Sequence, residues 1–144
     1  MKDLIIRNPK SKKEFEEYSH FRWKNLRKPL NMPIESMFDT LEESSFHLIA
    51  LKDSKIVAAG RVHLNSPSQA QVRFMCVEQE YRRHGLGLKI LHGLENYASK
   101  KSCSEVILNA RDVALKFYLS SGYKKIGVYT SETGLPHTKM MKDI

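Results

Sequence analysis

The spacing of hydrophobic residues divides the chain into helices and strands. Phe15, Tyr18, Leu26 and, through its aliphatic stem, Arg22 recur at helical spacing behind Ser11. Ser11 and a glutamate three residues later have the form of a capping box. Pro29 ends this first helix, because its ring cannot continue the helical hydrogen bonding. The remaining pattern predicts helices at 34–42, 86–98 and 112–120 and strands at 4–7, 46–51, 56–64, 69–77, 104–108, 123–130 and 137–142.

Alternation is clearest over residues 69–77, where every second side chain is expected on the same face of a strand. The two expected faces are Ala70, Val72, Phe74 and Cys76 on one side, and Gln71, Arg73, Met75 and Val77 on the other. A polar turn at 52–55 joins the two preceding strands as a β-hairpin. Asp112 is expected to cap the last helix, with Gly122 just past its end.

The order of these elements is βααβββαβαββ. It predicts an α/β fold of the α+β type, in which helices flank a mixed sheet. The sequence has no repeat, no low-complexity linker and no break in composition, so we expect residues 1–144 to form one domain.

Composition narrows the class of protein further. The 144 residues include only two cysteines, Cys76 and Cys103, which can build neither a disulfide framework nor a paired zinc site. We therefore expect no metal. No apolar run approaches the roughly 20 residues that cross a bilayer, and charge interrupts the short apolar stretch near the N-terminus. These features predict a reduced, cytoplasmic protein with no membrane partner.

The chain carries 24 Lys and Arg against 16 Asp and Glu, a formal charge of +8. Such an excess of positive charge can favour binding of nucleic acid or of a small anionic ligand, or it can contribute to solubility alone. The positive residues are scattered, and only the run from Phe21 to Lys24 interleaves them with aromatic residues, inside a predicted helix. We therefore do not expect nucleic acid as a partner.

Candidate chemistry is densest where the strand at 69–77 leads into the helix at 86. The connecting residues are Arg82, Arg83, His84, Gly85, Leu86 and Gly87. Glycines allow close approach of the backbone, and the free N–H groups of a helix's first turn form an anion site. The alternative to an anion site is a strand-to-helix turn in which the glycines serve packing. Neither a Walker loop nor a dinucleotide fingerprint fits, because no Gly-Lys-Ser/Thr follows and Ile90 replaces the third glycine.

These residues resemble the Arg/Gln-x-x-Gly-x-Gly/Ala motif of the GNAT N-acetyltransferase superfamily. A second motif of the family lies about 30 residues later and is matched by Ala114, Phe117, Tyr118, Gly122 and Tyr123. The predicted order of elements is also similar to the family's topology. The resemblance implies a GNAT fold, whose central strands splay apart, and the transfer of an acetyl group from acetyl-CoA to a primary amine by direct attack.

The resemblance also implies where acetyl-CoA would bind. The end of the central strand would pair its backbone with the pantetheine arm, so Cys76 need not be a nucleophile and is expected to be a core thiol. Backbone N–H groups of residues 83–88 would hold the pyrophosphate. The implied contacts are Met75, Cys76, Val77, Arg82, Arg83, His84, Gly85, Leu86, Gly87, Leu88 and Asn109.

Tyr118 matches the family tyrosine that protonates the departing thiolate, a task suited to a phenol that is neutral at neutral pH. Its alternative role is packing beside Phe117. Many relatives have Asn seven residues before this tyrosine, where Arg111 stands here. Either Asn109 or Arg111 is therefore expected at the cofactor, and Arg111 could instead bind a phosphate or cap the strand edge.

The base that takes the amine proton is left open. Many relatives use Glu near Gln71, and a glutamine cannot accept that proton. His63, Glu132 and His137 are titratable alternatives, and a chain of water molecules would also suffice. The acceptor, a small molecule or a peptide, and a homodimer are open as well. The missing glutamate favours a rival of another class, a non-catalytic acyl-CoA-binding or nucleic-acid-associated module with the same fold.

Overall fold

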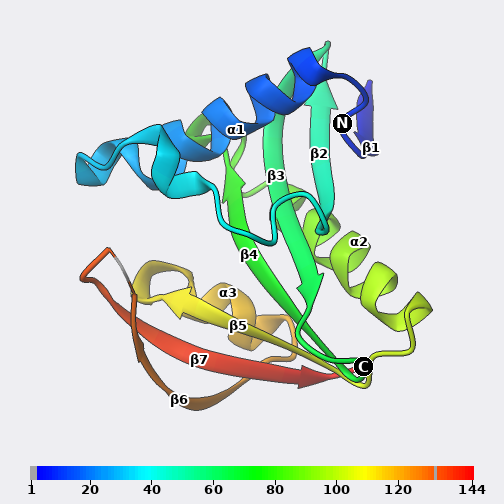
Figure 1. The fold of residues 1–144 in the computed structure, drawn as a ribbon, viewed down its shortest axis with the longest axis vertical. Coiled ribbons are helices and arrows are strands. Elements are labelled where there is room, and N and C mark those ends of the chain that lie inside the picture. The colour runs from blue at the N-terminus through cyan, green and yellow to red at the C-terminus, as the bar shows by residue number, and fades with distance from the viewer. Residues whose placement is uncertain (1–2, 132) are drawn as a thin grey trace.

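The computed structural model describes residues 3–131 and 133–144, which form a twisted sheet with helices on both faces (Figure 1). The strands are β1 (Leu4–Arg7), β2 (Phe46–Lys52), β3 (Lys55–Leu64), β4 (Gln69–Val77), β5 (Glu105–Arg111), β6 (Lys124–Thr130) and β7 (Pro136–Asp143). The helices are α1 (Lys12–Leu26), α2 (Leu86–Lys100) and α3 (Leu115–Ser120), with 3₁₀ turns η1 (Lys28–Leu30), η2 (Ile34–Met37), η3 (Gln79–Tyr81) and η4 (Asp112–Ala114).

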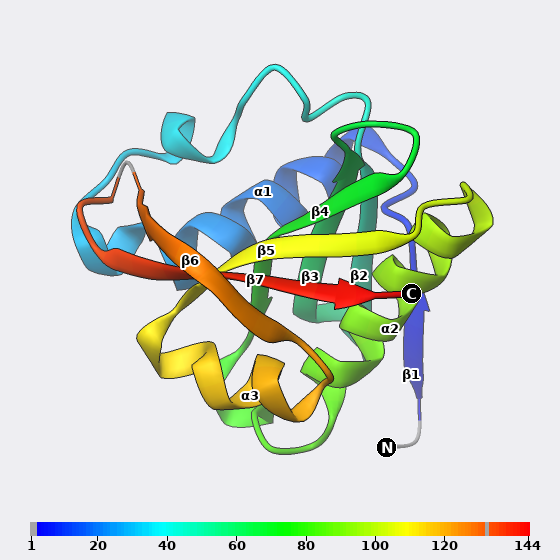
Figure 2. The same cartoon turned by 90° about the horizontal axis from the view of Figure 1, so that it is seen from below.

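The seven strands lie in the order β1-β2-β3-β4-β5-β7-β6. Only β4 and β5 run parallel, and every other neighbouring pair is antiparallel. Helix α1 covers one face of β3 and β4, and α2 covers the other face (Figures 1 and 2). The predicted α/β fold with a mixed sheet flanked by helices is therefore confirmed.

Helix α1 begins as the sequence predicts, with one difference. The Ser11 hydroxyl accepts a hydrogen bond from the Glu14 backbone N–H at 3.1 Å, as in a capping box. The Glu14 carboxylate does not return to the Ser11 backbone. It accepts from the Lys10 N–H at 2.7 Å and from the Arg7 guanidinium, whose hydrogen bond lowers the pKa of Glu14 to about 2.

The predicted helix at 34–42 is wrong beyond its first turn, because only Ile34–Met37 is helical and in the 3₁₀ form. The residues that follow form turns that direct two carboxylates inward. The Asp39 carboxylate accepts hydrogen bonds from both terminal nitrogens of Arg61, each at 2.9 Å. The Glu42 carboxylate accepts a hydrogen bond from Nη2 of Arg22 at 2.6 Å. Both arginine side chains are fully buried, so pairing them outweighs continuing the helix.

The predicted alternation along β4 is also wrong past Val72, because the strand contains a β-bulge. Phe74 has φ +55°, a left-handed value that is rare for a side chain of this size. The register shifts there, since Ala59 pairs with Cys76 whereas Arg61 pairs with Arg73. The extra residue in β4 reverses which face the following side chains occupy.

The bulge divides the side chains of β4 between the two layers of core. Ala70 and Val72 pack in the cluster under α2, while Cys76 packs in the cluster under α1. Met75 and Val77, expected on the opposite face from Val72, instead join the α2 cluster. Beyond the bulge, the β4 side chains that face α1 and those that face α2 are therefore the reverse of what the sequence pattern predicts.

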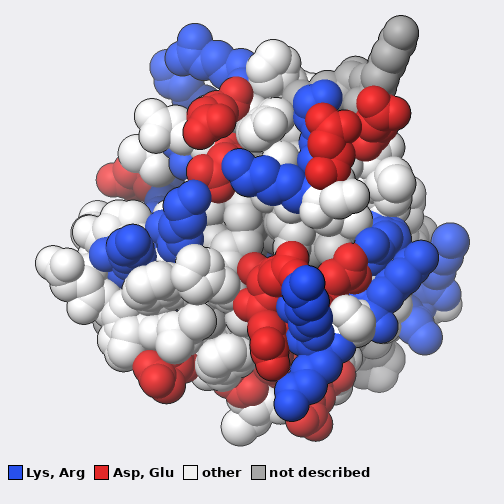
Figure 3. Space-filling view, turned by 90° about the horizontal axis from the view of Figure 1, so that it is seen from above, with Lys and Arg blue, Asp and Glu red and all other residues white. Residues whose placement is uncertain are grey.

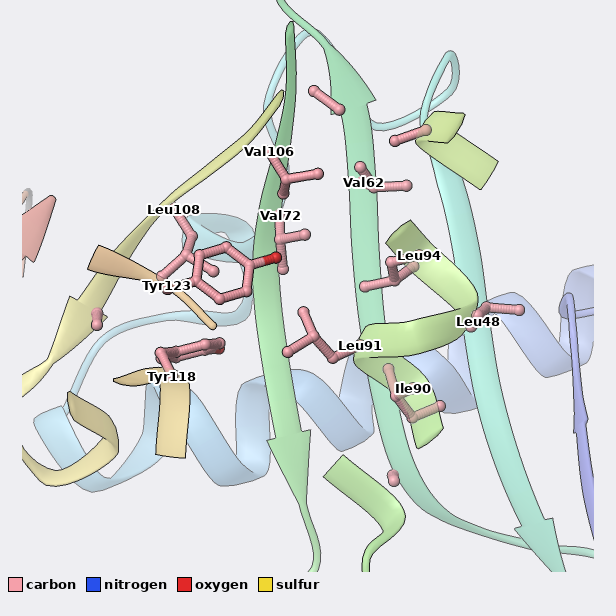
Figure 4. Close-up of a cluster of buried hydrophobic side chains, with 14 of the residues drawn as sticks. Leu48, Val62, Val72, Ile90, Leu91, Leu94, Val106, Leu108, Tyr118 and Tyr123 are labelled. Carbon is pink, nitrogen blue, oxygen red and sulfur yellow. The ribbon is translucent and has the colours of Figure 1, made fainter. Parts of the chain in front are cut away.

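The core beneath α2 extends from the central strands to the C-terminal half. Figure 4 shows Ile90, Leu91 and Leu94 of α2 facing the sheet, with Tyr118 and Tyr123 continuing the cluster toward β5. All five side chains are buried. Among the described residues, no helix is long and apolar enough to cross a membrane.

The C-terminal half differs from its prediction at two places. Strand β5 continues to Arg111, so Asn109 lies inside the strand, not at its end. Asp112 is no side-chain cap, because it begins η4 and α3 starts three residues later without a side-chain hydrogen bond at its N-cap. Gly122 does follow the helix as predicted, with φ +95°. The N–H of Tyr123 bonds to the Tyr118 carbonyl at 3.0 Å, which completes a Schellman motif.

Candidate active site

Strands β4 and β5 separate from each other, and the candidate site lies in the fork between them. They pair only at Gln69–Glu105, Ala70–Val106 and Gln71–Ile107, after which β5 stays with β7. Figure 1 shows the two strands meeting at one end and diverging toward the other. The backbone of β4 beyond Gln71 therefore has no neighbouring strand on that side, and its N–H and C=O groups can pair with an extended ligand.

A cavity of about 190 Å³ occupies this fork. Its walls come from the end of α1, from β4, β5 and α3, and from the segment around β6 and β7. Side chains that carry candidate chemistry and line it are Arg27, Gln71, Arg73, Asn109, Arg111, Tyr118 and His137.

Tyr118 lines the cavity with its side chain 8% exposed. Its hydroxyl has no hydrogen-bond partner among residues 3–131 and 133–144. The neighbouring Tyr123, whose ring centroid lies 5.7 Å away, donates its hydroxyl proton to Glu95 at 2.7 Å. Burial raises the pKa of Tyr118 well above its ordinary value, so its phenol is neutral and keeps a proton to donate.

Phe117 does not compete with Tyr118 for the same space. Its ring packs against the first turn of α2, where an added Cβ on Gly87 would lie 3.4 Å from it. A side chain at Gly87 would therefore reach Phe117 at ordinary van der Waals distance, and the α2 N-terminus packs close to α3. This contact holds the connecting loop next to the helix that carries Tyr118.

The loop from β4 to α2 has the backbone form of an anion site. Arg83 and Gly85 both have left-handed backbones, with φ of +67° and +77°. Gly85 is the N-cap of α2 and supplies no side-chain cap, so the first-turn N–H groups of the helix lack a capping partner. An added Cβ at Gly85 would meet no atom within 4 Å, so the space beside it is open.

The side chains of this loop do not all point toward that space. Leu86 is 2% exposed and belongs to the core, so only its backbone can reach a ligand. The Arg82 guanidinium donates back to the Val77 carbonyl at 3.1 Å. His84 and Leu88 are exposed beside the α2 N-terminus.

Cys76 lies on the α1 side of β4 and is buried. Burial raises the pKa of its thiol to about 12, so a reactive thiolate is strongly disfavoured at neutral pH. Met75 lines the cavity and, like Val77, packs against the cluster on the α2 side. Contributions from Cys76 and Val77 to the fork are therefore limited to their backbone.

Asn109 and Arg111, the two β5 residues that the sequence offers as cofactor contacts, occupy different places. Asn109 lines the cavity from within the strand, opposite Lys139. Arg111 reaches across the fork, where its Nη2 donates to the Leu26 carbonyl at the end of α1, at 2.7 Å. Burial lowers the pKa of Arg111 from its ordinary value. Arg111 thus connects the two walls of the cavity.

Of the candidate bases, His137 is the described residue that both lines the cavity and carries an imidazole ring. Its Nδ1 donates to the Leu135 carbonyl at 2.9 Å, which leaves Nε2 as an acceptor in the neutral ring. His63 is buried between Arg61 and Asn65 and does not line the cavity, and burial lowers its pKa. Gln71 lines it as an amide, and Glu132 lies outside the described residues.

An arginine cluster beside the cavity was missed by the sequence reasoning. Four guanidinium groups surround the Phe74 ring with their carbons 4.5–5.7 Å from its centroid, namely those of Arg22, Arg27, Arg61 and Arg73. The signal was visible, since Arg22 falls on the apolar face of α1. It was interpreted through its aliphatic stem alone.

The surface charge is mixed over the face seen in Figure 3. Lysine and arginine side chains alternate there with aspartate and glutamate, and no continuous basic surface covers this face. A continuous basic surface is the electrostatic footprint of nucleic-acid binding. The face in Figure 3 does not show that footprint.

Comparisons with known proteins agree with this geometry. A family model described as "Acetyltransferase (GNAT) domain" matches residues 11–144. The chain is 31% identical over 144 residues to an uncharacterized N-acetyltransferase, YjcF of Bacillus subtilis, covering 99% of this chain and 100% of the relative. Both matches span the fork, the loop before α2 and Tyr118.

Solved structures share the fold at lower sequence identity. ElaA of Escherichia coli superposes with a TM-score of 0.80 at 17% identity, covering 99% of each chain. An aminoglycoside 6′-N-acetyltransferase complexed with coenzyme A has a TM-score of 0.80 at 16% identity, covering 96% of each chain. These similarities extend over the whole sheet and its helices.

Proposed function

The chain belongs to the GNAT acetyltransferase family and is an acetyltransferase, and we propose that residues 1–144 act as one domain that transfers acetyl from acetyl-CoA directly to an amine. The observation that carries this proposal is the fork between β4 and β5, whose cavity is lined by Tyr118, a tyrosine with no hydrogen-bond partner for its hydroxyl among the described residues. The solved relative that holds coenzyme A supports acetyl-CoA as the co-substrate.

The residues of the fork fit an acetyl-CoA molecule. The open backbone edge of β4, at Met75, Cys76 and Val77, would pair with the amide groups of the pantetheine arm. The N–H groups of residues 83–88 would hold the pyrophosphate at the N-terminus of α2, where the helix dipole favours negative charge. Leu86 and Gly87 would act through their backbone alone, and Arg83, His84 and Leu88 would border the phosphates.

The side chains of the cavity would then perform the proton transfers. The amine nitrogen forms a bond to the thioester carbon, and the carbon–sulfur bond breaks with its electron pair leaving on sulfur. Tyr118 would give its hydroxyl proton to that sulfur, and Nε2 of His137 would take the proton that the amine loses. Positioning of the two reactants in a closed fork supplies the rest of the rate enhancement.

The rival function is a non-catalytic acyl-CoA-binding or nucleic-acid-associated module. It is favoured by Gln71, which stands where many relatives carry a glutamate. It is opposed by Tyr118, since a purely structural tyrosine in this core would be expected to bond its hydroxyl as Tyr123 does. Release of free thiol from acetyl-CoA in the presence of amines distinguishes the enzyme from a module that only binds.

Binding of coenzyme A is the first test of the proposal. At a concentration of 100 times its Kd, CoA should stabilise the protein by about 2.7 kcal/mol and raise the Tm on the order of 5–10 °C. ATP and NAD should not do so at the same concentration. The measurement is thermal unfolding followed by circular dichroism. If millimolar CoA leaves the Tm unchanged, the proposal loses its basis.

Gly85→Val should abolish this shift, because a β-branched side chain disfavours the left-handed backbone and would enter the open space beside the α2 N-terminus. Gly134→Val is the matched control. Gly134 has φ +78° and equally open surroundings, yet lies in the connection between β6 and β7. The control should lose comparable intrinsic stability and retain the CoA shift. A folded Gly85→Val protein that binds CoA normally would show that the phosphate loop has been misplaced.

A further inference from the structure

The cavity in the fork is lined by cations without a carboxylate among the described residues. Arg27, Arg73 and Arg111 contribute to its walls, and Asp39, which pairs with Arg73 at 3.1 Å, lies outside it. If the acceptor amine occupies this cavity, as the proposed function requires, its surroundings are positively charged. Such surroundings lower the pKa of an amine and favour the neutral form that can attack.

Arg111 differs in its hydrogen-bond partner from Arg22 and Arg61, the two arginines that are fully buried. Arg22 and Arg61 are buried against carboxylates at 2.6–3.0 Å. Arg111 is half-buried, donates to the neutral carbonyl of Leu26, and has no carboxylate partner in residues 3–131 and 133–144. Burial lowers its pKa from the ordinary value.

We propose that the acceptor is a small amine that also carries an anionic group, a carboxylate or a phosphate, and that Arg111 binds that group. A guanidinium has five N–H donors in a planar fork that fits the oxygen pair of either anion. The hydrogen bond to Leu26 uses one donor within the described part of the chain, and it holds the group at the cavity wall. The anion supplies a counter-charge that no carboxylate of the described residues supplies to Arg111.

The same charges argue against acceptors that carry several amines. A polyamine or an aminoglycoside brings a further ammonium group to the place where Arg111 would bind an anion, and like charges there raise the cost of binding. The volume of about 190 Å³ also favours a small molecule. Arg111 would thus determine acceptor specificity through its contact with the anionic group.

The test compares pairs of acceptors that differ only in the anionic group. The carboxylate pair is β-alanine and β-alaninamide, and the phosphate pair is O-phosphoethanolamine and ethanolamine. Each is assayed with acetyl-CoA by release of free thiol, using the wild type, Arg111→Gln and Lys116→Gln. Lys116 is the matched control, because it is an exposed residue of neighbouring α3 and its change removes the same charge.

We expect kcat/KM at least 10-fold higher for the anionic member of one or both pairs, and the pair that responds identifies carboxylate or phosphate. Arg111→Gln should remove that preference, chiefly through a 10-fold or larger rise in KM, with the uncharged member changed less than 2-fold. Lys116→Gln should preserve the preference. Acetyl-CoA should bind all three proteins with similar affinity in thermal unfolding.

Three results would overturn this inference. The uncharged members could be used equally well, Arg111→Gln could slow both members equally, or Arg111→Gln could weaken CoA binding and so place Arg111 at the cofactor. Thermal stabilisation by CoA without acetylation of any of the four amines would also reject the inference and leave acetyl-CoA binding intact. Absence of any CoA effect would reject the proposed function itself.

Discussion

Tyr118→Phe is expected to lower kcat by about 10²–10⁴-fold, the usual contribution of a general acid. The substitution keeps the ring, its 5.0 Å contact with Phe117 and its place in the core. It removes only a hydroxyl that makes no hydrogen bond to the described residues, so the free energy of unfolding and the affinity for acetyl-CoA should change little. Steady-state thiol release, together with urea unfolding, measures both quantities.

Tyr123→Phe is the matched control and should give the reverse pattern. The Tyr123 hydroxyl donates to Glu95, which is 8% exposed and also accepts from Lys142. Removing this donor should cost about 1–3 kcal/mol of stability, since a buried carboxylate loses a partner, while kcat stays within 2-fold. A Tyr118→Phe protein with full activity, or one destabilised like Tyr123→Phe, would show that Tyr118 is a core residue.

The pH dependence of the reaction follows from the direction of the Tyr118 pKa. Burial raises this pKa above its ordinary value near 10, so the phenol stays protonated throughout the neutral and mildly alkaline range. The rate should therefore increase with pH as the acceptor amine loses its proton. No descending limb should occur below about pH 9.5, and kcat measured against pH would reveal one if Tyr118 ionised early.

Much of the fold could be predicted from the sequence because local and long-range preferences agree there. The hairpin of β2 and β3 turns at Asp53 and Ser54, which both adopt left-handed backbones as a two-residue hairpin turn requires. The amphipathic pattern of α2 and the glycine after α3 likewise gave the correct elements. The β4 bulge could not be predicted, because Phe74 carries no signal for a left-handed backbone.

Prediction of the candidate site had a similar limit. Motifs indicated the loop before α2, where Gly85 has a left-handed backbone that favours glycine, and Tyr118, which lines the cavity. The orientation of Arg111 depends on where the end of α1 lies relative to β5, and a contact across 85 residues leaves no mark on local spacing. The same holds for Asp39 and Glu42, whose loop is organised by arginines from α1 and β3.

Glu42 is the acidic residue that connects α1 to the centre of the sheet. Its carboxylate accepts from Arg22 at 2.6 Å through one oxygen and from Arg61 at 3.0 Å through the other. Both arginine side chains are fully buried, whereas Arg61 alone has a second partner in Asp39. Their guanidinium groups lie 5.0 and 4.9 Å from the centre of the Phe74 ring, so this carboxylate also supports the bulge of β4.

Glu42→Gln should therefore destabilise the protein by roughly 2–3 kcal/mol, measured as the free energy of unfolding in urea. The amide keeps the size of the side chain but leaves the buried Arg22 without its carboxylate. The 17% exposure of Glu42 holds the loss below that of a fully buried pair. Glu43→Gln, an exposed neighbour with the same charge change, should alter stability by less than about 0.5 kcal/mol. Equal effects of the two variants would mean that the cluster is held by packing on Phe74, with no net contribution from the Glu42 charge.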